Sequence, residues 1–395
     1  MAKTINIKSY DSAGVFIKNI SDANFNSFKK TINGGLSNLT FKLARKVDNF
    51  NTNNDVSVGN IIEIWIIDGD TTSEGILIYK GYIEQQNIFV DGGSEYVEIV
   101  CFGLVSKLKN DILKSGSQTK LYTKATDGLT ITVADVAPAE VADILKEIID
   151  LYNINNPTFP IYYNPAGVST IETTLVNMKY YFNAVGYLEA IERCREVAPQ
   201  NWYWYMGSDN IIYFKPISSV ADHQFNLSQH IKRITASKSA DSVKNVILIY
   251  NGDATYKQYK DDASIAIYGR RVEQLTDSNI KDSTTMDNLG AAFINENKDP
   301  KIRIEVELID NNESNLGYDI ESINPGQTCM IVGLTPDENI FTENMIIKEV
   351  NWSLTKATIV IETEKNYNFD RLILDIERKL KDLTTDTGNI PETYT

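Results

Sequence analysis

One acidic stretch of this chain has the composition of a metal-binding loop. It reads Asp68-Gly69-Asp70-Thr71-Thr72-Ser73-Glu74, and its oxygen-bearing side chains at alternate positions would suit a calcium ion. An EF-hand loop, however, requires Gly at its sixth position and Glu at its twelfth, where this chain has Ser73 and Tyr79. We therefore expect a solvated turn between two strands, and we expect the protein to bind no metal and no cofactor.

Residues that could act as a catalytic base or nucleophile are scarce. The chain has two histidines, His223 and His230, and it lacks the HExxH, GxSxG and GxxxxGK[ST] motifs. Two S-x-x-K strings begin at Ser27 and Ser353, without the companion motifs of enzymes that use such a pair. The sequence thus predicts that the protein is not an enzyme, although its 53 acidic residues always offer the two carboxylates of a glycosidase.

Aromatic rings gather in the segment Trp202 to Tyr205, with Tyr213 and Phe214 close behind, and could stack on sugars or bases. Alternate side chains of a strand point to opposite faces, so at least one pair of these rings is expected in the core. The intervening Gly207-Ser208-Asp209-Asn210 is typical of a hairpin turn. We expect these aromatic residues to be structural.

The composition is that of a soluble globular protein. Of the 395 residues, 42% are hydrophobic and 23% are charged, and no run approaches the roughly 18 apolar residues that span a bilayer. The stretch Met1 to Tyr10 lacks the apolar core of a signal peptide, so we expect no membrane segment and no export by the general secretory route. The cysteines Cys101, Cys194 and Cys329 are dispersed, which predicts small buried residues and no disulfide framework.

The negative charge of the chain is unevenly distributed. The net charge is −15, yet residues 1–120 contain 13 basic and 13 acidic side chains, so the acidic excess lies in the rest. An acidic body does not attract phosphate backbones, which argues against sequence-independent binding of nucleic acid. The same acidity suits a surface past which DNA slides without sticking, and plain solubility is its simpler explanation.

A β-rich pattern occurs twice. The first copy comprises Val58 to Ile66, Ile76 to Ile83 and Tyr96 to Phe102, and the second comprises Pro325 to Val332, Asn344 to Asn351 and Thr358 to Thr363. In both copies a Gly precedes the first apolar strand, and the strands have similar lengths and spacing. The repeat predicts two related β-modules, at residues 1–113 and 221–365. Three such chains around an axis would present six similar modules to a hexameric partner.

A small α+β domain is predicted between the modules, at residues 114–220. A helix is predicted after Pro138, because apolar residues recur there at the spacing of one buried helix face: Val141, Ile144, Leu145, Ile148 and Tyr152. A second helix, about Asn183 to Val197, is expected to have a stripe made of Val185, Leu188, Ile191 and Arg195. The aromatic hairpin completes this domain, and a further short helix is expected within the second module from Met286 to Asn297.

Residues 366–395 are predicted to form an amphipathic helix and a flexible tail. Asn368 is a suitable N-cap, and one face of the helix consists of Phe369, Leu372, Ile373, Ile376, Leu380 and Leu383. Such a helix packs either on its own domain or on copies of itself. The predicted fold class is therefore α+β and mainly β, with two tube-like β-modules (barrel or sandwich) that flank the α+β insert.

The order of these parts resembles the baseplate or tail-tip hub proteins of bacteriophages and related contractile injection systems. The resemblance covers nearly the whole chain. It rests on Gly34-Gly35-Leu36 before Leu39 to Leu43, Val58-Gly59 with Tyr79 to Ile83, Trp202 to Pro216, Asn245-Val246, Asp262 to Ile265, Tyr268 to Arg271, and Asn324-Pro325-Gly326.

The resemblance implies a homotrimer whose modules form a pseudo-hexameric ring with a channel for genomic DNA. Its implied partners are the tail tube protein, the distal tail protein, and a central spike, fibre or tape-measure protein, in a virion assembled in the host cytoplasm. The interface candidates are Phe369, Leu372, Ile373, Ile376, Leu380, Arg270 and Arg271. Two alternatives remain: a distal tail protein, which is a hexameric adaptor, and a β-sandwich protein that binds or cleaves carbohydrate.

Overall fold

The fold is described from a computed structural model, which divides the chain into two compact units. Unit 1 comprises Met1–Pro216 with Val243–Lys298, and unit 2 comprises Ile217–Ser242 with Asp299–Thr395. The structure describes residues 3–45, 54–67, 75–91, 94–113, 122–126, 131–133, 138–165, 168–178, 180–182, 185–199, 201–227, 229–251, 256–277, 280, 282–300, 302–310, 317–332 and 345–363. Residues 243–298 thus group with unit 1, while the four-part division made from the sequence stays a prediction.

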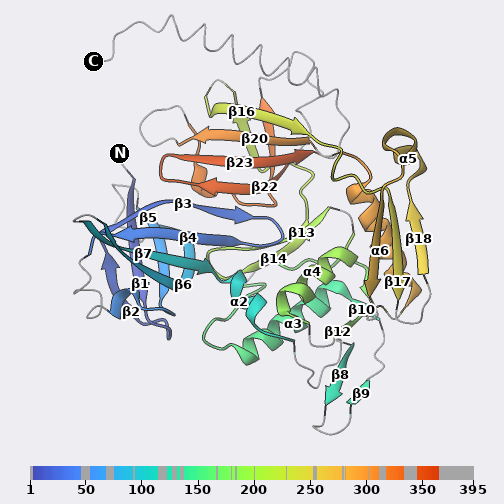
Figure 1. Ribbon diagram of the computed structural model, residues 1–395, viewed down its shortest axis with the longest axis horizontal. Helices are drawn as coiled ribbons and strands as arrows, with labels where there is room; N and C mark the ends of the chain where they lie inside the picture. Colours follow the sequence, from blue (N-terminus) through green and yellow to red (C-terminus); the bar gives the residue numbers. More distant parts are fainter. Residues whose placement is uncertain are drawn as a thin grey trace, which may run out of the picture. The chain divides into compact units, whose positions relative to one another are not determined.

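A seven-stranded sheet forms the first part of unit 1 (Figure 1). Its strands are β1 (Thr4–Tyr10), β2 (Phe16–Ile20), β3 (Ala23–Thr31), β4 (Leu36–Leu43), β5 (Ile61–Ile67), β6 (Ile76–Asp91) and β7 (Ser94–Gly103). The order is β3-β4-β7-β6-β5-β1-β2, and all neighbours are antiparallel. In β4 the buried Leu39, Phe41 and Leu43 alternate with exposed polar residues, as a half-buried strand requires.

Unit 2 contains a second sheet of similar construction. Its strands are β15 (His223–Asn226), β16 (Ile231–Lys238), β20 (Ile302–Ile309), β21 (Thr328–Val332), β22 (Met345–Trp352) and β23 (Lys356–Thr363). The order is β16-β20-β23-β22-β21-β15, antiparallel except for β15 beside β21. A 3-10 turn, η2 (Ile320–Ser322), precedes β21. Among the described strands, no pairing within either unit closes a barrel.

The two sheets share a glycine turn immediately before the first strand of each repeat. Gly59 and Gly326 have φ angles of +92° and +84°, a region that glycine adopts without cost. The Gly59 amide donates to the Ile83 carbonyl at 2.8 Å, and the Ile83 amide donates to the Asn60 carbonyl at 2.8 Å. In unit 2 the Gly326 amide donates to the Ile347 carbonyl at 2.8 Å, and the Ile347 amide donates to the Gln327 carbonyl at 2.9 Å.

The next strands repeat the same bulge. In β6, Ile83 and Gln85 pair with two consecutive residues of β7, so β6 contains one extra residue at this point. In β22, Ile347 and Glu349 pair with two consecutive residues of β23 in the same way. Strand order and bulge position therefore match, and the prediction of two related β-modules is confirmed. We call β3–β7 the first module, and β16 with β20–β23 the second module.

The rest of unit 1 is a mixed α+β region around a second core. Its helices are α2 (Val105–Asn110), α3 (Val141–Asn155), α4 (Tyr187–Val197), α5 (Asp262–Tyr268) and α6 (Ser283–Asn297). Its strands are β8 (Tyr122–Thr126), β9 (Ile131–Val133), β10 (Ala139–Glu140), β11 (Asn177–Met178), β12 (Tyr181–Phe182), β13 (Trp202–Met206), β14 (Ile212–Pro216), β17 (Val246–Asn251), β18 (Tyr256–Lys260) and β19 (Val272–Asp277). None of the helices in the described residues is long and apolar enough to cross a membrane.

The helix predicted after Pro138 is confirmed as α3, and all five residues of its predicted face are buried. The prediction for α4 is wrong in part. The helix starts at Tyr187, because Gly186 is its extended N-cap, and Val185 lies outside it. Its buried face consists of Tyr187, Ala190, Ile191, Cys194 and Val197. Arg195 is half-buried, and its guanidinium pairs with Glu296 at 3.2 Å.

Candidate assembly surfaces

Strand β2 exposes apolar side chains at the end of the first sheet. It follows a turn fixed by Asp11, whose Oδ1 accepts hydrogen bonds from the amides of Ala13 (2.9 Å) and Val15 (2.8 Å). Among the described strands β2 pairs with β1 alone. Phe16 is 51% exposed and Ile17, which points to the opposite face, is 36% exposed. An apolar edge strand of this kind is a template for pairing with another chain.

A charged cluster, the Arg45 network, lies beneath this edge. Arg45 is buried and donates to Asp22 at 2.6 and 3.0 Å and to Asp55 at 3.0 Å. Lys18 of β2 pairs with Asp55 at 2.9 Å. The hydrogen bond from Arg45 lowers the pKa of Asp22. Burial raises the pKa of Asp55, but hydrogen bonds from Arg45 and Lys18 outweigh it, and the pKa falls below its ordinary value. The network therefore ties β2 to the loop ends behind it.

The hairpin of β6 and β7 exposes a second apolar group. Ile88, Phe89 and Val90 are 46%, 39% and 68% exposed, and the Phe89 ring stacks on Tyr96 with centroids 4.9 Å apart. When the two modules are aligned at the shared bulge, Ile88 corresponds to Trp352, because each lies three residues after the bulge. Ile88 pairs with Val97, and Trp352 pairs with Ala357. Trp352 is fully buried. The same position of the repeat is thus a core residue in one module and a surface residue in the other.

The solvent-facing side of the first module is polar and nearly neutral. An open groove of about 500 Å³ is lined by Asn24, Ser27, Asn38, Thr40, Lys42 and Glu98. Lys42 pairs in register with Glu98, and its ammonium group lies 4.6 Å from the centroid of the Tyr96 ring. The groove therefore combines one cation and one anion with amides and hydroxyls, and it has no strong field of either sign.

The matching side of the second module carries ion pairs. Glu307, the register counterpart of Lys42, accepts from Lys356 at 3.1 Å and from Lys232 at 3.3 Å. The hydrogen bond from Lys356 is the main cause that lowers the pKa of Glu307. Arg303 lies 3.4 Å from both Glu305 and Glu349. The two modules therefore share a backbone and differ in the charge of this side.

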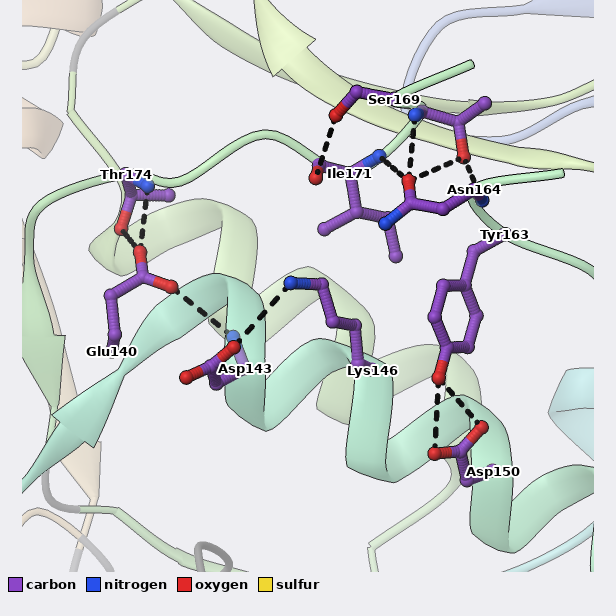
Figure 2. A network of polar contacts seen from close by, with 10 residues as sticks. Glu140, Asp143, Lys146, Asp150, Tyr163, Asn164, Ser169, Ile171 and Thr174 are labelled. Carbon is purple, nitrogen blue, oxygen red and sulfur yellow. Dashed lines mark hydrogen bonds and ion pairs between the residues drawn. The ribbon is translucent and has the colours of Figure 1, made fainter. Parts of the chain in front are cut away.

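A polar network connects α3 to the segment 163–174 (Figure 2). Asn164 Oδ1 accepts from the amides of Thr170 (2.7 Å) and Ile171 (3.0 Å), which closes a tight loop. Farther along α3, the Tyr163 hydroxyl donates to Asp150 at 3.0 Å. At the start of the helix, Glu140 accepts from the Asp143 amide as N-cap and also binds Thr174. The network fixes the two ends of this segment to the helix, through Tyr163 and Thr174.

Of the four aromatic residues at 202–205, Trp202 is half-buried and the other three belong to the core, as predicted. Trp204 is fully buried, and its Nε1 donates to Glu192 Oε1 at 2.8 Å. Burial raises the pKa of Glu192 against that hydrogen bond. Tyr203 and Tyr205 on the opposite face are also buried. These rings are therefore not presented to a sugar or a base.

The three cysteines and His223 are withdrawn from solvent. The three cysteines are buried, and burial raises the pKa of each thiol. His223 is held between the Tyr318 hydroxyl (2.9 Å) and Gln327 Oε1 (2.8 Å). Within the described ranges, no three His, Cys, Asp or Glu side chains are arranged to hold a metal. The loop Asp68 to Glu74 lies outside the described residues.

The predicted interface residues have different outcomes. Arg270 is exposed, whereas Arg271 is half-buried, and its amide donates to Asn245 Oδ1 at 2.8 Å. Phe369, Leu372, Ile373, Ile376 and Leu380 lie outside the described residues, so their role stays a prediction. Sequence reasoning missed the exposed edge at β2. Only the pairing of the strands shows that this one ends a sheet.

Comparisons with known proteins place this architecture among tail proteins. The sequence profile of a family described as prophage endopeptidase tail matches residues 107–365, about two-thirds of the chain. No curated protein matches the sequence.

Three solved structures share the fold. A tail protein from Neisseria meningitidis MC58 has a TM-score of 0.56 at 11% identity, over 92% of this chain and 97% of that one. The 43 kDa tail protein of prophage MuSo2 from Shewanella oneidensis has a TM-score of 0.54 at 11% identity, over 90% and 97%. The prophage tail protein gp18 from Listeria monocytogenes EGD-e has a TM-score of 0.52 at 12% identity, over 95% and 99%.

Proposed function

The chain belongs to the prophage endopeptidase tail family, and from this premise we propose that it is the structural hub of a phage tail tip or baseplate. Three copies form a ring that joins the hexameric tail tube to a central spike or fibre. The ring surrounds a channel through which genomic DNA passes without specific binding, and it is located in the virion.

The register-matched repeat is the observation that carries this proposal. Each chain contributes two modules with the same strand order, the same positive-φ glycine and the same bulge. Three chains then supply six similar modules, so a trimer with threefold symmetry can contact a tail tube with sixfold symmetry. The apolar edge at β2 supplies a contact for the ring, since such an edge is stabilised when another chain covers it.

The first experiment is the mass of the purified protein by light scattering, with negative-stain images of the same peak. We expect about three times the 44.4 kDa of one chain and a threefold ring. A sixfold ring would favour the distal tail adaptor, and a stable monomer at high concentration would favour the carbohydrate-binding alternative.

A charge placed on the edge tests the contact itself. Phe16→Asp puts a carboxylate into the proposed interface, and we expect the trimer to dissociate while the monomer stays folded. Val220→Asp is the matched control, because Val220 is also an exposed apolar residue, at 72% exposure, and is not on β2. Equal masses for Phe16→Asp and the unchanged protein would place the ring contact elsewhere.

The channel is proposed to be lined by the polar sides of the two modules. Neither side presents a strong positive field, since Lys42 has Glu98 opposite and the second module carries Glu305 and Glu307. Glu305→Lys with Glu307→Lys creates cationic positions that would retain phosphate groups. We expect slower DNA ejection from phage with this change, and unchanged ejection would exclude these positions from the channel.

We also propose that this chain is structural and does not cleave peptides, despite the word endopeptidase in the family description. The buried thiols and the enclosed His223 support this view. Incubation of the purified protein with casein and with peptidoglycan tests it, and release of fragments that survives further purification would contradict it.

A further inference from the structure

Leu175 has a backbone conformation that leucine rarely adopts. Five described residues other than glycine have a positive φ, and four of them are asparagine: Asn33, Asn164, Asn201 and Asn210. Asparagine tolerates the left-handed region better than most side chains. Leu175 is the fifth, with φ of +60°. The chain thus carries a bulky residue at a position where Asn or Gly would suit the backbone better.

The backbone on both sides of Leu175 is fixed to α3. The carboxylate of Glu140 accepts hydrogen bonds from the amide of Thr174, at 2.6 Å, and from its hydroxyl group. On the other side, the Val141 amide donates to the Val176 carbonyl at 3.0 Å. Thr174 is 5% exposed, so this clamp is largely shielded from water. Figure 2 shows Glu140 between Thr174 and the start of the helix.

The side chain held in this way points into water. Leu175 is 88% exposed, the highest value among the exposed large hydrophobic residues of the described chain. Neither the backbone conformation nor the exposure of the isobutyl group stabilises this chain. A buried clamp that holds a strained residue with an exposed apolar side chain has the features of a presented contact residue. We propose that Leu175 is an anchor that inserts into an apolar pocket of another protein of the tail.

The charge around the anchor indicates the chemistry of that pocket. Two carboxylates, those of Glu140 and Asp143, lie at the start of α3 beside the clamp, and the ammonium group of Lys146 lies 3.4 Å from Asp143 (Figure 2). Glu172, three residues before Leu175, is exposed. The complementary surface is an apolar pocket bordered by Lys or Arg.

Binding measurements with purified tail proteins test the anchor. The probes are the tail tube protein, the distal tail protein and the central spike protein of the same phage, each titrated against the full chain. This choice of probes rests on the proposed function. Leu175→Asn removes the apolar group and keeps a residue that suits the backbone. We expect at least a tenfold weaker complex with one probe and a melting temperature raised by about 1–3 °C.

Two further variants separate the anchor from a structural effect. Leu175→Met keeps an apolar side chain of similar volume and should retain binding within about twofold. Ile154→Asn changes another exposed apolar residue, at 73% exposure, about 20 Å along α3 from Glu140, and should also retain binding.

Several results would overturn the anchor. These are unchanged binding by Leu175→Asn, a lower melting temperature for that variant, or no binding of the unchanged chain to any probe. A loss of self-association in Leu175→Asn would instead assign the residue to contacts between copies of this chain. Light scattering on the same samples measures the trimer separately. Absence of the trimer would contradict the hub proposal, whereas a trimer whose Leu175→Asn variant binds unchanged would contradict only the anchor.

Discussion

The first and second modules have the same strand order and bulge, yet they differ in what surrounds the strands. In the second module the hairpin of β22 and β23 ends at Trp352, which is fully buried. In the first module the hairpin continues to Asp91, and Ile88 at the matching register is half exposed. The repeat therefore preserves the backbone pattern, while the extensions of each copy decide which side chains meet water. Matching positions of the shared strands therefore differ in exposure, although the pairing of the strands is the same.

The largest effect is expected at this shared register position. Trp352→Ala removes a fully buried ring and should cost about 3–5 kcal/mol in the free energy of unfolding. Ile88→Ala, at the same position of the first module, should cost less than about 1 kcal/mol, because Ile88 is 46% exposed. Urea unfolding followed by circular dichroism measures both. Similar losses of unfolding free energy in the two variants would contradict the conclusion that this position is a core residue in the second module and a surface residue in the first.

The next effect concerns charge. Arg45→Met leaves Asp22 and Asp55 without their shared cation, and should cost about 2–3 kcal/mol, because Arg45 and Asp55 are buried. Arg303→Met in the second module should change stability by less than about 1 kcal/mol, since the Arg303 side chain is 43% exposed and its pairs are screened. The same unfolding assay compares them. A larger cost for Arg303→Met would reverse the comparison.

A smaller effect, equal in the two modules, is expected at the shared glycines. Gly59→Ala and Gly326→Ala each place a Cβ on a residue with positive φ, and each should cost about 1–2 kcal/mol. Apart from the adjacent residues, no atom lies within 4 Å of the position that a Cβ would take at Gly59, so backbone strain is the cause there. Hydrogen exchange of the Ile83 and Ile347 amides reports the two sites separately. Strongly unequal costs would show that one copy no longer depends on the glycine.

Mild acid should give the smallest change. The pKa values of Asp22 and Asp55 lie below the ordinary value of 3.8, so their contribution to stability is complete above about pH 5, starts to fall as the pH approaches 3.8 and is lost as the pH falls through the lowered pKa values of the folded protein. The melting temperature of the unchanged protein should therefore fall between pH 5 and pH 3. Arg45→Met should flatten that slope, because it removes the main partner of both carboxylates. An equal slope in the variant would assign the acid sensitivity to other groups.

Much of the architecture could be predicted from local sequence. Helix α3 follows from the spacing of its apolar residues, and the modules follow from repeated strands after a glycine. The start of α4 was predicted too early, because Val185 continues the apolar spacing while Gly186 sets an extended cap. The candidate surfaces were less accessible, since Phe16 and Trp204 are both aromatic residues of strands and only one of them is buried.

Local sequence patterns were sufficient to predict the class of fold and the repeat, because periodicity and turn residues act over a few neighbouring residues. The family was recognised separately, as a resemblance in the order of the parts. Three features could be recognised from the tertiary contacts but not from the sequence: residues 243–298 group with unit 1, β2 ends a sheet, and Leu175 is held strained and exposed. Each of these depends on partners distant in sequence, such as Glu140 for Thr174, 34 residues away. Burial is the sum of such contacts, and the pattern of one segment does not specify what covers it.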